Sequence, residues 1–76
     1  MPCYYFDYHV GEAITLDDEG VDLASSDAAR QLAFEALGQL LIDRSPQSPS
    51  GRIAVEVRDQ SAVIVRVSAA IVVDQV

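Results

Sequence analysis

The stretch that decides the fold occupies residues 26–43 and reads SDAARQLAFEALGQLLID. Its apolar residues recur in pairs four positions apart, which places them on one face of a helix. The pairs are Ala28 and Ala29, Leu32 and Ala33, Ala36 and Leu37, and Leu40 and Leu41. Ser25 or Ser26 can cap the first turn, and Asp27 complements the helix dipole there. The pattern predicts an amphipathic helix that buries one broad face.

Strand patterns flank this helix on both sides. Residues 3–9 alternate aromatic side chains with others, and a short second strand at residues 13–16 completes a hairpin over about 3–17. The segment DDEG at residues 17–20 then forms a turn. After the helix, residues 44–52 contain two Pro, three Ser and a Gly, which predicts a loop. Alternating Val and Ile predict a second hairpin over about 53–73.

The element order is therefore strand, strand, helix, strand, strand. One apolar helix face must cover one face of one sheet, and a right-handed crossover places the third strand antiparallel beside the first. We expect a single α+β domain over residues 1–76. It is a two-layer, open-faced sandwich with a four-stranded antiparallel sheet in the order 2-1-3-4. The residues expected to face the helix are Tyr4, Phe6, Tyr8, Val55, Val57, Val63, Val65 and Val67.

The opposite sheet face is expected to stay uncovered, because no segment remains to cover it. It is the candidate interaction surface, and its residues are Tyr5, Asp7, His9, Arg58, Ile64 and Arg66. Two Arg beside Tyr5 resemble a platform for single-stranded nucleic acid. Pairing of Arg58 and Arg66 with Asp7 and Glu56 is expected to cancel that positive charge.

Charge and length restrict the possible partners. The 76 residues include 12 acids and five Arg, with no Lys, for a formal charge of −7. Nine of the acids and one Arg lie in residues 1–43. This balance argues against nucleic acid as a partner, because affinity for phosphates depends on basic residues. A partner protein is expected to be basic, or flat and apolar.

Neither a membrane span nor a secretion signal is visible. The longest apolar stretch, residues 68–73, is far shorter than the roughly 20 residues of a spanning helix. The N-terminus has no basic residue ahead of an apolar block. The single Cys fits a reducing compartment, so the chain is predicted to be cytoplasmic.

Candidate catalytic and metal-binding residues do not form a complete set. Asp7 and His9 lie about 7 Å apart along a strand, but Cys3 would lie about 20 Å from His9. The acidic residues 17–22 lack the spacing of a calcium loop. Pro2 could act as the general base of a small tautomerase, but those enzymes have a helix directly after their first strand. No cofactor, metal site or catalytic residue is predicted.

Self-association is expected for two reasons. The last strand would form an apolar edge of about ten residues without the Lys or Pro that normally protects an edge. The core of so short a chain is also small. The sequence predicts a non-enzymatic interaction or regulatory module that forms a homodimer through this edge or through the open face.

Four sequence segments resemble the pattern of a family of short bacterial proteins of unknown function. They are MPCYYFDYH at residues 1–9, DDEGVDL at 17–23, DAARQLAFEAL at 27–37 and AVEVRDQ at 54–60. The chain differs from the family pattern at Cys3, where Arg is frequent, and at residues 59–61, where Gly is common. The resemblance implies no activity and no functional residue. A weaker resemblance to HicB-type antitoxins, without their GCxxxG segment, implies a regulatory protein that sequesters a basic partner.

Overall fold

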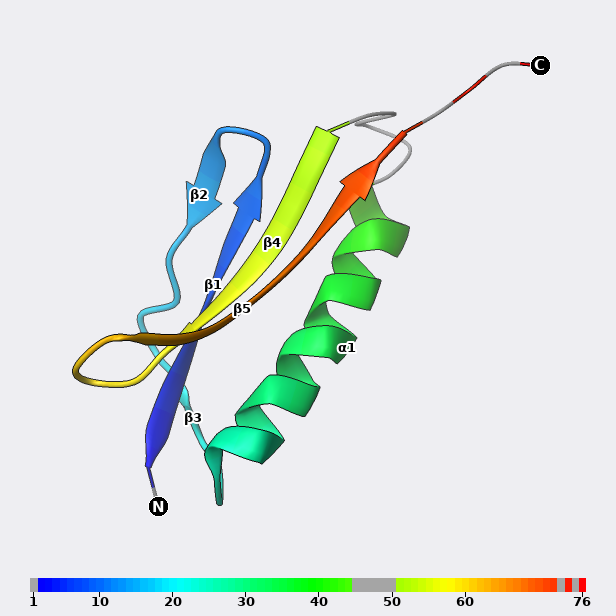
Figure 1. Cartoon of the computed structure of the whole chain (residues 1–76). Helices are drawn as coiled ribbons and strands as arrows, with labels where there is room; N and C mark the ends of the chain where they lie inside the picture. Colours follow the sequence, from blue (N-terminus) through cyan, green and yellow to red (C-terminus); the bar gives the residue numbers. More distant parts are fainter. Residues whose placement is uncertain (1, 45–50, 73, 75) are drawn as a thin grey trace.

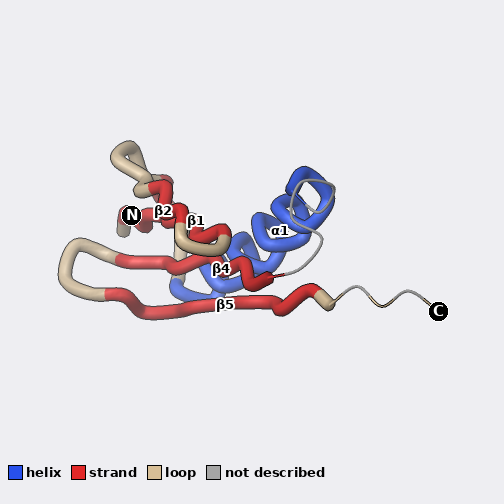
Figure 2. Tube along the Cα trace, turned by 90° about the horizontal axis from the view of Figure 1, so that it is seen from above, coloured by secondary structure: helices blue, strands red, loops and turns tan. Residues whose placement is uncertain are grey.

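The computed structural model describes residues 2–44, 51–72, 74 and 76 (Figure 1). Among these residues, one helix, α1 (Ser26–Arg44), packs on one face of an antiparallel sheet of five strands. Seen from above, the strands form one layer and the helix the other (Figure 2). The predicted two-layer α+β architecture is confirmed. In the part of the chain that is described, no helix has the length and hydrophobicity that crossing a membrane requires.

The sheet differs from the prediction by one strand. The four longer strands follow the predicted path in the order β2-β1-β4-β5, and all neighbours are antiparallel. They are β1 (Cys3–Val10), β2 (Ala13–Thr15), β4 (Gly51–Arg58) and β5 (Val63–Ile71). A fifth strand, β3 (Val21–Asp22), pairs with the start of β1 on the edge that β2 also occupies. The prediction of four strands is therefore wrong, because two residues are too few to show alternation.

The helix begins at Ser26, directly after its capping residue Ser25. The Ser25 hydroxyl accepts a hydrogen bond from the Ala28 N–H at 3.2 Å, which satisfies one of the free donors of the first turn. The helix ends at Arg44, one residue beyond the predicted end. The predicted loop at 44–52 extends too far, because β4 already begins at Gly51. The rest of that loop, residues 45–50, lies outside the described residues.

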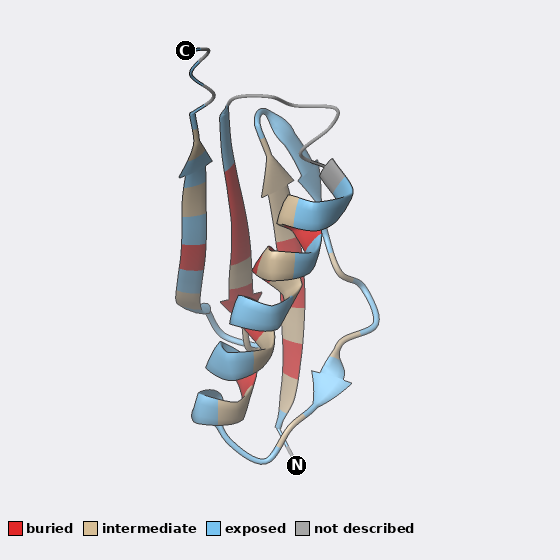
Figure 3. Cartoon of the chain, turned by 90° about the vertical axis from the view of Figure 1, so that its right-hand side faces the viewer, coloured by how far each residue is buried: buried red, intermediate tan, exposed pale blue. Residues whose placement is uncertain are grey.

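The core lies between α1 and the three long strands (Figure 3). Ala29 and Ala33 are fully buried, and their small side chains let the helix approach the sheet closely. Val55 and Val57 of β4 are also fully buried, and each contributes about 1.5–3 kcal/mol by leaving water. The other buried core residues are Tyr4, Phe6, Leu37, Leu40, Ile53 and Val67.

One predicted core residue is exposed. Val63 keeps 54% of its surface accessible, although it was expected to face the helix. A bulge explains the difference: Val63 pairs with Arg58, whereas Val65 pairs with Val57, so that Ile64 is extra. Val63 therefore shares the face of Arg58, away from the helix.

Candidate interaction surfaces

A partly buried ion pair joins β1 and β4 on the face opposite the helix. Asp7 is only 3% exposed, and the Arg58 Nε donates to its Oδ2 at 2.8 Å. The other oxygen of Asp7 accepts the Asp17 N–H at 2.9 Å. Arg58 also donates from Nη2 to the Asp17 carbonyl at 2.7 Å, and its guanidinium lies 4.5 Å from the centre of the Tyr5 ring. The predicted pairing of Arg58 with Asp7 is confirmed, but Asp7 is not an accessible surface residue.

The Asp17 carboxylate fills a gap in the edge of β1. Phe6 lies between the part of β1 that pairs with β2 and the part that pairs with β3. Its N–H donates to Asp17 Oδ2 at 3.0 Å instead of to a strand. The other oxygen of Asp17 accepts the N–H groups of Glu19 and Gly20 at 3.0 and 3.2 Å. Burial opposes ionisation of Asp17, but these donors and Arg58 outweigh it and lower its pKa below the ordinary value.

The turn that carries Asp17 folds back onto the sheet. Gly20 has a φ of +78°, and a Cβ on it would lie 2.5 Å from Cys3 Sγ and 2.9 Å from Cε2 of Tyr5. The turn therefore covers the end of the sheet face that was expected to be open. That expectation is wrong here because Asp17 is anchored to β1. The Tyr5 ring contacts the chain's own Arg58 and Gly20, which argues against a base-stacking role.

A second charged group lies further along the same face. Glu56 of β4 contacts His9 Nε2 at 3.3 Å and Arg66 Nε at 3.2 Å, one with each carboxylate oxygen. The predicted pairing of Arg66 with Glu56 is confirmed. The Arg66 side chain is 58% exposed, so water and salt screen this pair and its contribution to stability is small.

The six residues of the predicted interaction surface are thus not equally accessible. Tyr5, His9 and Arg58 are partly buried, and Asp7 is buried. Ile64 and Arg66, both on β5, are exposed. The accessible part of the surface follows β5 at the edge of the sheet.

Sequence reasoning missed the structural role of Asp17 and Gly20. Residues 17–20 were expected to form a solvated turn. A local signal was present, because an Asp that accepts an N–H two residues later is typical of an Asx turn. The hydrogen bond that anchors the turn to the sheet runs from the Phe6 N–H to the Asp17 carboxylate. It joins residues 11 positions apart, so no local sequence pattern indicates it.

Strand β5 is a free edge. In antiparallel strands, successive residues direct their N–H and C=O groups to alternate sides. The Phe6 N–H donates to Asp17, away from β4. Phe6 pairs with Val57 of β4, so the N–H and C=O groups of Val57 point toward its other partner, Val65 of β5. Val65 in turn directs its groups toward β4. Because the direction alternates along β5, the N–H and C=O groups of Arg66, Ser68 and Ala70 point away from β4. The described chain provides no strand to receive them.

The other candidate sites are placed as follows. Among the residues whose positions are described, no three His, Cys, Asp or Glu side chains lie close enough together to hold a metal ion. Pro2 is exposed and borders a shallow depression whose charged lining residues are Asp22 and Asp59. Acidic residues around Pro2 do not suit the carboxylate substrate that a small tautomerase would bind.

Comparison with known proteins places the chain in a family. A family described as a domain of unknown function, DUF6894, matches residues 3–70. The resemblance to an uncharacterised family is therefore confirmed. Neither the comparison with curated proteins nor that with solved structures returns a match.

Proposed function

We propose that this chain, which belongs to the DUF6894 family, is a non-enzymatic interaction module that forms a homodimer by pairing the β5 edges of two copies. The observation that carries the proposal is the free edge of β5, a strand of nine residues with the sequence VIVRVSAAI. An edge of this length without Lys or Pro readily accepts another strand.

The sequence of β5 suits antiparallel pairing with itself. A two-fold axis at Ser68 places Arg66 of each copy opposite Ala70 of the other, so the two Arg side chains do not oppose each other. All three outward-facing residues then exchange N–H···O bonds with the second copy. On the helix side of the sheet, Val67 of each copy would lie opposite Ala69, which extends the apolar layer.

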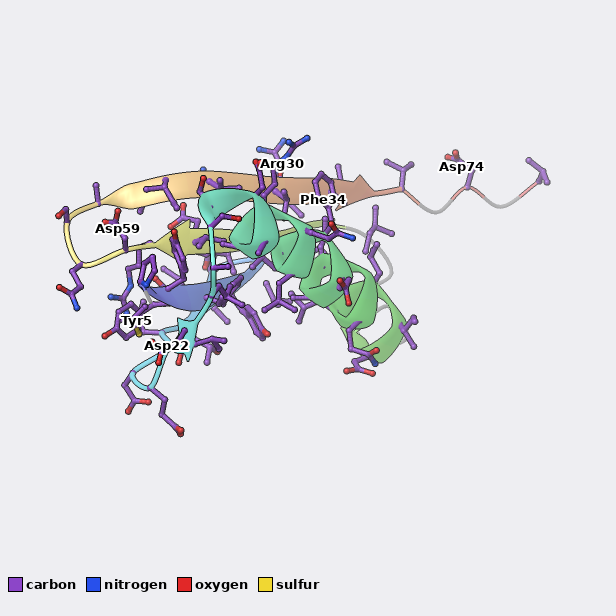
Figure 4. The ribbon with its side chains drawn as sticks, turned by 90° about the horizontal axis from the view of Figure 1, so that it is seen from below. Tyr5, Asp22, Arg30, Phe34, Asp59 and Asp74 are labelled. Atoms are coloured by element: carbon purple, nitrogen blue, oxygen red, sulfur yellow. The ribbon has the colours of Figure 1, made fainter. Side chains whose placement is uncertain are left out.

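The helix supports the same arrangement. Phe34 is 53% exposed and lies with Arg30 on the flank of α1 next to β5, away from Asp22 (Figure 4). Two sheets joined at β5 around an axis perpendicular to the sheet carry their helices on the same side. The Phe34 flanks of the two helices would then face each other across the joint. Burial of this ring adds apolar area to an otherwise small core.

The charged residues favour an interaction module over an enzyme. Asp7, Arg58 and Glu56 hold strands together through pairs within the chain. Asp17 accepts three backbone N–H groups and is likewise structural.

A HicB-like role, in which the acidic part of the chain sequesters a basic partner, is a second candidate, favoured by the nine acids in residues 1–43. A cytoplasmic location stays a prediction.

The test is the mass in solution of three proteins, measured by light scattering across a dilution series. The wild-type chain should give twice its mass of 8.2 kDa. Ser68→Pro removes an outward N–H that the monomer does not use, so this variant should fold and be monomeric. Ser68→Ala keeps the N–H and should remain dimeric. A wild-type chain of 8.2 kDa at every concentration, or a dimeric Ser68→Pro variant, would refute the proposal.

A further inference from the structure

The edge of the sheet opposite β5 carries an apolar groove. Helix α1 packs chiefly against β4 and β5, which leaves β1 and the short strands β2 and β3 incompletely covered on the helix side. A depression of about 440 Å³ lies there. Its apolar lining includes Tyr8, Leu16, Val21, Leu32 and Ala36.

The groove exposes large aliphatic side chains that the fold itself does not use. Leu16 is 67% exposed and Val21 is 41% exposed. This exposure follows from the break in the sheet edge between β2 and β3. A turn fills the break and is anchored to β1 through Asp17, and Leu16 and Val21 lie at the two ends of this turn. Apolar side chains gathered at one edge are typical of an interaction site.

The charge around the groove is negative. Asp17 and Asp18 lie in its lining, and Glu19 follows them in the chain. None of the lining residues is basic. An apolar floor with an acidic margin is complementary to a segment that carries aliphatic side chains on one face and Lys or Arg beside them.

We infer that this groove binds a basic amphipathic helix of a partner protein, with the aliphatic face of that helix against Leu16, Val21 and Leu32. The inference deepens the regulatory candidate above by stating the chemistry of the partner. It does not depend on self-association, because the groove and β5 lie at opposite edges of the sheet.

The probe is a fluorescein-labelled synthetic helical peptide with Leu on one face and Lys on the other. A second peptide has Ser in place of Leu, and a third has Glu in place of Lys. Fluorescence anisotropy should show binding of the first peptide that weakens as salt is added. The Ser and Glu peptides should each bind at least about tenfold more weakly, because they lack the apolar face and the positive charge respectively.

Two variants locate the binding. Leu16→Ser changes an exposed side chain in the groove and should weaken the Leu–Lys peptide about tenfold, a loss typical of an interface anchor. Ile42→Ser is the matched control, because Ile42 is also exposed, at 70%, but lies outside the groove. It should bind like the wild type. The monomeric Ser68→Pro variant should also bind normally, which separates this inference from the proposed dimer.

Nuclear magnetic resonance supplies a second measurement. Addition of the Leu–Lys peptide should shift the amide signals of Leu16, Val21 and Leu32, with no comparable shifts along β5. The inference is overturned if the peptide does not bind, if the Ser peptide binds equally well, or if the shifts lie elsewhere. It is also overturned if Leu16→Ser, and not Ser68→Pro, abolishes self-association, because the groove would then hold a second copy of the chain.

Discussion

Replacing Gly20 by Ala tests whether the acidic turn rests on the sheet. Two costs add at this position. A Cβ at a φ of +78° costs about 1–2 kcal/mol, because left-handed backbone disfavours side chains. The same Cβ would lie 2.5 Å from Cys3 Sγ and 2.9 Å from the Tyr5 ring, and overpacking of this kind costs about 1–3 kcal/mol. Gly20→Ala should therefore lower the free energy of unfolding by about 2–5 kcal/mol.

Gly11→Ala is the matched control. Gly11 has a similar φ of +59°, but nothing lies within 4 Å of the Cβ it would gain. Gly11→Ala should therefore lower the free energy of unfolding only by the backbone cost, about 1–2 kcal/mol. Urea unfolding followed by far-ultraviolet circular dichroism measures both variants at one protein concentration, so that dimerisation does not enter the comparison. Equal losses for the two variants would refute the packing of the turn against Cys3 and Tyr5. A Cys3→Ala background, which removes the closest contact, should reduce the extra loss at Gly20.

Three further perturbations test the contacts around this turn and the helix. Arg58→Met leaves the buried Asp7 carboxylate without its ion pair and should lower the urea midpoint of unfolding, whereas an Arg58→Lys variant as stable as the wild type would show that the fork of hydrogen bonds has no role. The pKa of Asp17 is lowered in the folded state, so its contribution is complete above the ordinary pKa of about 3.9 and disappears as pH falls through the folded value. Asp17→Asn should thus be less stable than the wild type at neutral pH, with a difference that shrinks in acid; a difference independent of pH would contradict this. Ser25→Ala should lower stability by about 0.5–2 kcal/mol in thermal unfolding, and Ser26→Ala by much less; equal effects would place the cap elsewhere.

The elements with a regular hydrophobic period could be predicted from the sequence, because the period is a local property. The paired apolar residues of α1 span residues 28–41, and the alternation in β1 and β4 covers residues 3–9 and 53–58. The bulge at Val63 could not be predicted in the same way, because it depends on how β5 aligns with β4.

The candidate site was less accessible to sequence reasoning. Cross-strand pairing of Arg58 with Asp7 follows from the register and was expected. The burial of Asp7 does not follow from it, because it also depends on a turn ten residues later that donates the Asp17 N–H. The groove likewise depends on where α1 lies over the sheet, and no local pattern encodes that position.

The pairing of β1 with β4 sets the order in which the protein can fold during synthesis. Asp7 and Arg58 are 51 residues apart in the chain, yet they meet across neighbouring strands. A ribosome must therefore release most of the chain before the central strand pair can form. Until then, the aromatic side chains of β1 and the apolar face of α1 have no β4 to pack against. Contacts over such separations slow folding. A chain that ends before β4 should expose these faces permanently, which makes incomplete translation products of this protein natural substrates for chaperones and proteases.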